Sequence, residues 1–430
     1  MQRRNRTKRR HKRKFILLRL TMGQSHVRDS RRKPIILMAL ITAVSLFGDS
    51  MLYIALPIHW KEAGLNSLVE VGILLSVNRF IRLPLNPLIS WLYTKMSIRF
   101  GLIIAIIIVG STTVLYGWAQ GFVFWLILRC IWGLAWSIIR LGAYLMIIES
   151  STNENRGHFM GTFTGLSKIG TLVGMLTGGF FVEWFGIRDV TFVFGVLAFM
   201  VLPVVFQIPN SRNRTGSERS KVTRSFLIKQ PMLTWILLTV FLVMLCLDGM
   251  ITATLSHLID VRQSNLSLYG AIIGAAAMAG ILQASRLAIG VFLSPWVGKK
   301  SDGKWGRRPV LIIALLLASV FVSIVQFDLP LAVWLFNLLA ILLTSSILFV
   351  VMDAFTSDIV ADKAKAATIT LYLIVSDIGA AFGPVLGYLS ERSLGLSTTY
   401  WISAAVLFLL SVGWAFSAKM KSTNLVPLAQ

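Results

Sequence analysis

Charged residues are scarce in this chain, and acidic residues most of all. Only 14% of the 430 residues are charged, and 18 acidic residues stand against 42 lysines and arginines. A water-soluble domain uses about 25% charged residues to cover its surface, so this composition excludes an ordinary soluble protein. Hydrophobic residues make up 56% of the chain, which indicates a protein that lies in a lipid bilayer.

Motifs of enzymes and metal proteins are also missing. Cys130 and Cys246 are the two cysteines, and both lie in apolar runs, so they indicate no disulfide, metal or thiol chemistry. The five histidines have no metal-ligand spacing. No glycine-rich phosphate loop and no pair of nucleophile and base is found. We therefore expect neither an enzyme nor an ATP-driven pump, and no cofactor and no metal.

Apolar stretches follow one another along the whole sequence. Each has roughly 19 to 28 residues, enough to cross a hydrocarbon layer of about 30 Å as a helix. Backbone groups in lipid must bond internally, so spans of this length are helices. The predicted fold is an all-α membrane protein with twelve transmembrane helices: 34–58, 68–94, 100–118, 121–148, 158–182, 187–208, 232–258, 268–297, 309–327, 330–357, 366–390 and 398–418.

The two halves of the chain repeat each other. The tripeptide Gly72-Ile73-Leu74 recurs as Gly280-Ile281-Leu282, and the spaced residues Ser167, Gly170, Gly174 and Gly178 recur as Ser376, Gly379, Gly383 and Gly387. Such a repeat in an apolar chain indicates a transporter made of two pseudo-symmetric six-helix bundles around a central site. The predicted parts are a basic cytoplasmic arm (1–33), a first bundle (34–208), a cytoplasmic linker (209–231), a second bundle (232–420) and a cytoplasmic tail (421–430).

The formal net charge of +24 is distributed unevenly. If every span crosses, most lysines and arginines fall on one side, including 14 in residues 1–33. This asymmetry follows the positive-inside rule. It predicts a multi-pass protein of the cell membrane with both termini in the cytoplasm. The positive charge is then explained by membrane topology, and we expect no nucleic-acid partner. Three interpretations of the basic arm (1–33) remain open. The arm binds anionic lipid headgroups, it only sets the orientation of the protein in the membrane, or translation starts at Met22 and most of the arm is not made.

Five glycines are spaced along the predicted fifth span: Gly161, Gly170, Gly174, Gly178 and Gly179. This pattern resembles the glycine motif in the fifth helix of the drug:proton antiporters of the major facilitator superfamily, which usually have proline where this chain has methionine. The second half carries a partial copy with Gly383 and Pro384. Glycines four residues apart let a neighbouring helix approach closely and let their own helix bend. The alternative is ordinary close packing of two helices.

A second motif lies between the predicted eighth and ninth spans. Gly298, Asp302, Gly306, Arg307 and Arg308 resemble the cytoplasmic loop signature of the same superfamily, with one extra residue after the aspartate. An aspartate among several cations locks such a loop. We expect it to act as a latch that stabilises one of two bundle arrangements, or to set topology by charge alone.

Two charges in the spans are candidates for proton coupling. A charge at the bilayer centre costs at least about 2.5 kcal/mol, so each needs a partner or a cavity. Asp49 lies in the first span and Arg129 in the fourth, and the resemblance places both helices at the central cavity. We expect Asp49 to carry the proton and Arg129 to respond to it. The alternative is a permanent structural ion pair.

Other polar and aromatic residues in the spans are candidates for the substrate cavity. Lys168 and Asp377 correspond across the repeat, so they pair across the bundle interface or offer opposite charges to a substrate. The arginines attract an anionic substrate or bond to backbone carbonyls, and Trp136 offers stacking surface or packs against lipid. The candidates are Arg82, Trp136, Arg140, Lys168, Asp248, Arg286 and Asp377.

The resemblance implies a monomeric secondary transporter that works by alternating access. The expected activity is the export of small lipophilic or amphipathic compounds in exchange for protons. A proton-coupled symporter or exporter of a small metabolite or sugar is the alternative within the superfamily. A membrane receptor or scaffold that does not transport is the alternative from another class.

Overall fold

The computed structural model describes residues 33–151, 156–210, 231–262, 266–268, 271–303, 305–359 and 365–416. The predicted basic arm, apart from Lys33, lies outside the described residues. So do most of the predicted linker and the whole of the predicted tail.

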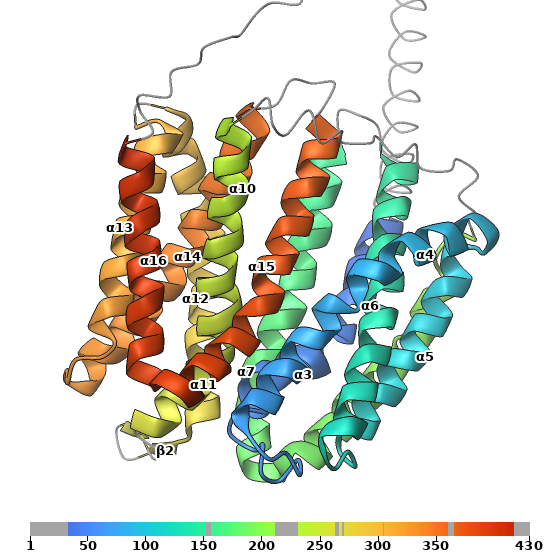
Figure 1. The fold of residues 1–430 in the computed structure, drawn as a ribbon. Helices are drawn as coiled ribbons and strands as arrows, with labels where there is room; N and C mark the ends of the chain where they lie inside the picture. The colour runs from blue at the N-terminus through green and yellow to red at the C-terminus, as the bar shows by residue number, and fades with distance from the viewer. Residues whose placement is uncertain are drawn as a thin grey trace, which may run out of the picture.

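Helices make up nearly all of the described chain (Figure 1). In the first half, a span of residues Lys33–Ala55 contains α2 (Phe47–Ala55) and is followed by α3 (Leu68–Phe80), α4 (Arg82–Lys95), α5 (Ile98–Tyr116), α6 (Phe122–Ser150), α7 (Arg156–Met200) and α8 (Leu202–Val205). The second half consists of α10 (Pro231–Val243), the π-helix η1 (Met244–Ile251), α11 (Thr252–Arg262), α12 (Ala275–Asp302), α13 (Arg307–Ile324), α14 (Leu331–Ile359), α15 (Lys365–Leu394) and α16 (Leu396–Phe416).

The described helices are consistent with twelve spans. Ten of them are long and apolar enough to cross a membrane. One of these ten joins two helices at Gly186, where φ is 76°. The predicted second span forms α3 and α4, which are separated by Ile81, although the φ of −61° and ψ of −26° at this residue remain helical. Pro84 explains the interruption in the helical hydrogen bonds, because its nitrogen cannot donate to the carbonyl of Phe80.

The predicted eighth span begins too early. Residues 268–274 were expected within it, but α12 begins at Ala275. The preceding residues form two short antiparallel strands, β1 (Leu266–Leu268) and β2 (Ala271–Ile273). The fold is otherwise the predicted all-α membrane fold of two pseudo-symmetric bundles.

The glycine stripe of α7 lies against the first span. A Cβ atom on Gly170 would stand 2.2 Å from the carbonyl oxygen of Ala43, and one on Gly174 would stand 2.6 Å from that of Phe47. The second half repeats this contact, since a Cβ on Gly383 would stand 2.4 Å from the Cα of Gly249 in η1. Glycine is therefore required at these positions for the helices to approach. Gly161 has open space around it.

The two halves close against each other at one end, where α7 bends and α12 begins (the lower end in Figure 1). Gly72 of α3 lies against the backbone of Pro384 in α15, and Gly280 of α12 lies against the backbone of Met175 in α7. These are equivalent contacts, because both glycines and both partners correspond across the repeat. We call this contact region the interhalf seal.

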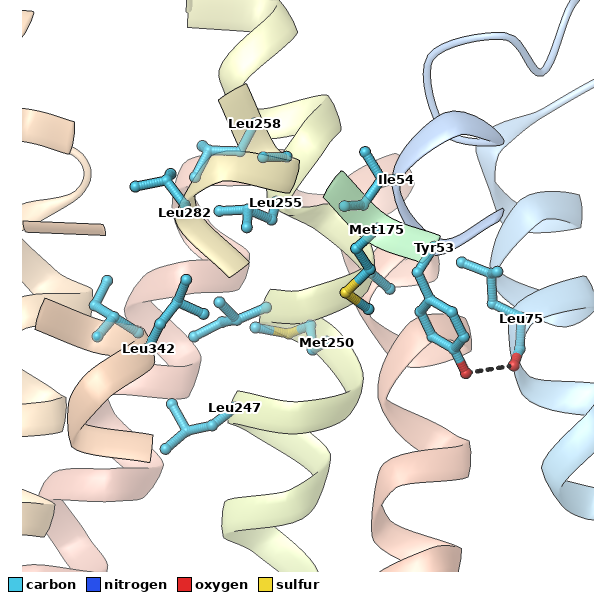
Figure 2. Packing of buried hydrophobic residues seen from close by; sticks show 14 of the residues in the cluster. Tyr53, Ile54, Leu75, Met175, Leu247, Met250, Leu255, Leu258, Leu282 and Leu342 are labelled. Carbon is cyan, nitrogen blue, oxygen red and sulfur yellow. Dashed lines mark hydrogen bonds between the residues drawn. The ribbon is translucent and has the colours of Figure 1, made fainter. Parts of the chain in front are cut away.

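Apolar side chains from both halves fill the region beside the seal (Figure 2). Tyr53 and Met175 of the first half and Met250 and Leu255 of the second belong to the same buried cluster. The hydroxyl of Tyr53 donates to the carbonyl of Leu75 at 3.2 Å. The cluster therefore closes the cavity at this end with packed side chains.

One carboxylate also joins the halves at the seal. Glu183 of α7 accepts hydrogen bonds from the backbone N–H groups of Gly274 and Ala277, both at 3.1 Å. Those groups belong to the N-cap and the first turn of α12, where N–H groups have no partner within their own helix. A side chain of one half thus caps a helix of the other half.

Candidate functional site

A cavity of about 360 Å³ lies between the two halves. Its volume falls within the usual range for sites that bind small molecules, roughly 300 to 1,000 Å³. Polar, charged and aromatic side chains from both halves form its wall: Asp49, Ser50, Tyr53, Asn78, Arg79, Arg82, Trp132, Trp136, Arg140, Lys168, Thr171, Asp248, Thr252, Gln283, Arg286 and Asp377, together with Leu46, Met175 and Leu287. All the candidates for the substrate cavity therefore line one space.

Asp49 and Arg129 form a buried ion pair at the edge of the cavity. The Nη1 of Arg129 donates to Oδ1 of Asp49, and Nδ2 of Asn78 donates to the same oxygen at 3.0 Å. The Nε of Arg129 donates to the carbonyl of Leu74 at 2.9 Å. The Arg129 side chain has no exposed surface, whereas Asp49 lines the cavity. The carboxylate is thus the member of the pair that a proton or a ligand can reach.

Asp248 lies beside two arginines, of which Arg79 comes from the first half and Arg286 from its own half. It lies in η1 of the second half, and its Oδ2 accepts from both terminal nitrogens of Arg79 of α3 at 3.4 Å. Its other oxygen lies 3.9 Å from Nη2 of Arg286 of α12. Arg79 also donates from Nε to the hydroxyl of Tyr53 at 3.3 Å. A π-helical stretch within a longer helix often marks a functional site, and here it carries the aspartate.

A second ion pair joins the halves through Asp377. The Nη1 of Arg140 of α6 donates to Oδ2 of Asp377 of α15 at 2.9 Å, and Nε of Arg140 donates to the hydroxyl of Tyr144 at 3.2 Å. Asp377 therefore pairs with Arg140 and not with Lys168, its partner under one of the two sequence-based alternatives. Lys168 lies within electrostatic range of Asp353 and lines the cavity.

Two stacked indole rings form the aromatic side of the cavity. The ring centroids of Trp132 and Trp136 lie 5.8 Å apart with an angle of 11° between the planes. Trp132 is buried and the guanidinium of Arg129 lies 5.9 Å from its ring centroid. Packing of Trp136 against lipid was the sequence-based alternative, but its place in the cavity wall favours contact with a ligand.

Several polar residues of the wall were not predicted from the sequence. Asn78 bonds Asp49, Tyr53 bonds Arg79, and Gln283 accepts from Nη1 of Arg286 at 3.4 Å. Each is a polar residue within an apolar span. A polar residue in an apolar span does not by itself indicate a cavity. The hydroxyl of a serine or threonine in a span commonly donates to a carbonyl of its own helix, as Thr42 does at 2.8 Å.

The loop motif lies in the second half. Gly298 and Asp302 belong to the end of α12, and Gly306, with a φ of 72°, precedes α13. Arg307 binds Asp302 at 2.8 Å and also pairs with Asp358 near the end of α14. Arg308 donates to the backbone carbonyl of Trp414 in α16. In this arrangement the motif ties helices of one bundle to each other.

The comparisons with known proteins match this arrangement. The family model described as Major Facilitator Superfamily matches residues 38–300 and 283–428. A multidrug resistance protein MdtG of Proteus mirabilis is 24% identical over 376 residues, which cover 84% of this chain and 90% of that protein. A multi-drug resistance efflux pump PmrA homolog of Lactococcus lactis is 22% identical over 290 residues, which cover 63% of this chain and 66% of that protein.

Solved structures share the fold. A bacterial homolog of the human lysosomal transporter Spinster, in an inward-facing and unoccupied conformation, superposes with a TM-score of 0.71 at 16% identity and covers 91% of this chain and 97% of that one. A D-xylose-proton symporter superposes with a TM-score of 0.69 at 13% identity and covers 88% of this chain and 96% of that one. The chain is a multi-pass membrane transporter and belongs to the Major Facilitator Superfamily.

Proposed function

We propose that this protein exports small amphipathic compounds from the cell in exchange for protons, by alternating access of the central cavity. The name of the Lactococcus lactis relative, a multi-drug resistance efflux pump PmrA homolog, supports export, and the multidrug resistance protein MdtG supports the class of substrate. The charge asymmetry of the sequence supports both termini in the cytoplasm. With that orientation, the interhalf seal lies at the outer face and the cavity of this state is reached from the cytoplasm. A single copy of the chain suffices, because both halves supply the wall.

The ion pair of Asp49 and Arg129 carries the proposal. Asp49 lies at the cavity wall, whereas Arg129 is enclosed by the first bundle and bonds the backbone of α3. Protonation of Asp49 removes the only carboxylate that Arg129 binds among the described residues. A charge without a partner in the bilayer costs at least about 2.5 kcal/mol. Protonation of Asp49 therefore favours a different packing of α2, α3 and α6, in which Arg129 is no longer left without a partner.

The glycines and the loop motif have separate roles in this mechanism. The stripe of Gly170, Gly174 and Gly178 lets α7 keep contact with the first span while the bundle moves as one body. Arg307 holds α12, α13 and α14 together, so the second bundle also moves as one body. The cavity between the bundles then opens on alternate faces.

The test is transport by everted membrane vesicles that carry the full chain. Ethidium, N-phenylnaphthylamine and anilinonaphthalenesulfonate serve as cationic, neutral and anionic fluorescent probes. Uptake that depends on an inward-acidic gradient is expected for at least one of them. Asp49→Asn is expected to abolish the dependence on the gradient while it leaves downhill exchange of the probe. Asp328→Asn, a change in a fully exposed carboxylate, is the control.

Two results contradict the proposal. One is gradient-driven uptake by Asp49→Asn at the wild-type level, which leaves Asp49 and Arg129 as a structural ion pair. The other is probe movement in the same direction as the proton, which identifies a symporter of the kind that the structural relationship to the D-xylose-proton symporter favours.

A further inference from the structure

The cavity wall carries more positive than negative charge. Five cationic side chains and three carboxylates line it, a formal excess of two positive charges. Every one of these carboxylates already binds at least one arginine: Asp49 binds Arg129, Asp248 binds Arg79 and Arg286, and Asp377 binds Arg140. A cationic ligand would therefore have to displace an arginine before it found a carboxylate. An anionic ligand meets no such competition at the remaining cations.

Arg82 is the cation best placed for an anion. It begins α4 directly after the interruption at Ile81 and lines the cavity. It forms no ion pair with any described residue, and its Nε is buried without a hydrogen-bond acceptor. Arg79 and Arg140 repel it, and Asp377, which attracts it, is already bound to Arg140. An anion at this point would fill an unmet hydrogen bond and reduce the repulsion.

The other unpaired polar atoms of the wall are mostly donors as well. Nε1 of Trp132 and Nε2 of Gln283 are buried without an acceptor. The orientation of the Gln283 amide is fixed because its oxygen accepts from Arg286. Among the buried side-chain atoms of the described wall, Oδ1 of Asn78 is the one acceptor without a donor. A ligand that satisfies this wall therefore presents acceptors, as an oxyanion does.

We propose that the cavity binds an amphipathic organic anion. An oxyanion head, such as a carboxylate or sulfonate, accepts hydrogen bonds from Arg82, and an apolar or aromatic body lies against the stacked rings of Trp132 and Trp136. The inference rests on the proposed function only in that it takes this cavity as the substrate site. It narrows the class of cargo to anions, which neither the family nor the names of the relatives specify.

Binding to the purified full chain in detergent, without a pH gradient, tests the inference. The probes are naphthalenesulfonate, the neutral naphthalenesulfonamide and the cationic naphthylmethylammonium, which share one aromatic body. Calorimetric titration is expected to give a Kd for the sulfonate at least about tenfold lower than for either other probe. One hydrogen bond to a charged group lowers a Kd by a factor of about ten to a hundred. Arg82→Gln is expected to raise the Kd of the sulfonate by that factor.

Matched variants separate the head site from general effects on folding. Arg82→Gln is expected to leave the Kd of the neutral sulfonamide within about twofold, which shows that the cavity is intact. Arg82→Lys keeps the charge and is expected to recover part of the affinity. Lys95→Gln removes an exposed cation at the end of α4 and is expected to change nothing.

Three results overturn the inference: tighter binding of the cationic probe, no saturable binding of the sulfonate, or an unchanged Kd of the sulfonate in Arg82→Gln. None of them bears on proton coupling, because no gradient is present in the titration. Conversely, gradient-driven uptake by Asp49→Asn contradicts the proposed exchange for protons and leaves the anion site untouched. The two proposals therefore fail separately.

Discussion

The carboxylate of Glu183 offers a direct test of how the seal is held. It accepts two hydrogen bonds at 3.1 Å from the first turn of α12, and it comes from the other half of the chain. Glu183→Gln keeps the shape of the side chain but removes its charge and leaves one acceptor oxygen. A hydrogen bond to a charged group contributes about 1.5 to 3 kcal/mol, and a carboxylate at a helix N-terminus a further 0.3 to 1 kcal/mol or so. We expect the substitution to cost the sealed state about 1 to 3 kcal/mol, a 5- to 150-fold shift toward the state open at this end.

Distance measurement between spin labels reads out this shift. Lys61 of the first half and Val261 of the second are exposed, and both lie at the sealed end. Each is replaced by cysteine and labelled in a chain without Cys130 and Cys246. Pulsed electron resonance on wild type is expected to give one short distance. Glu183→Gln is expected to add a population at longer distance, because opening at the seal separates the halves.

Glu70→Gln is the matched control. Glu70 is also a carboxylate at a helix N-terminus, but it accepts from the backbone N–H of Asn66, in its own half. It is expected to leave the distance distribution unchanged. An unchanged distribution in Glu183→Gln would refute the reasoning, since it would show that the apolar packing of the seal alone holds the halves together.

Two further predictions concern the helices around the cavity. Gly174→Leu is expected to lower the thermal unfolding midpoint of the purified protein strongly, because a Cβ there would stand 2.6 Å from the carbonyl oxygen of Phe47. Gly161→Ala, in open space, is expected to leave the midpoint within a few degrees, and a large drop there would contradict the packing argument. Arg140→Asp and Asp377→Arg are each expected to reduce transport at least tenfold, because each leaves two like charges facing across the halves. The double variant is expected to recover much of the loss in the same vesicle assay, and equal defects in single and double variants would show that the pair does more than join the halves.

The sequence determines the fold well because its signals repeat. Several independent patterns indicate the same architecture: apolar runs of membrane length, the half-chain repeat, and the spacing of Gly170, Gly174 and Gly178. A wrong boundary at one span therefore leaves the predicted architecture unchanged. Local departures have local causes. Pro84 interrupts the helical hydrogen bonds of the second span, and the strands before Ala275 shorten the eighth. Neither cause is visible in an average over twenty residues.

The site is harder to predict, because depth in a helix does not fix the direction of a side chain. The sequence placed Asp377 and Lys168 at equal depth, but the structure turns Asp377 toward Arg140 of α6. The charged residues predicted for the substrate cavity all lie in its wall, since charges in apolar spans need a partner or a cavity. Uncharged members such as Gln283 gave no comparable signal. Their role depends on the arginine beside them, and only the packed structure shows that neighbour.

The winding of the seventh span has a consequence of its own. The eight residues Met244–Ile251 form wider turns than the α-helix on either side, and Asp248 stands in the middle of them. Rewinding this segment to about 3.6 residues per turn would rotate the aspartate relative to α10 and withdraw it from Arg79. The pitch of this one helix therefore decides whether the aspartate meets the arginine of the opposite half.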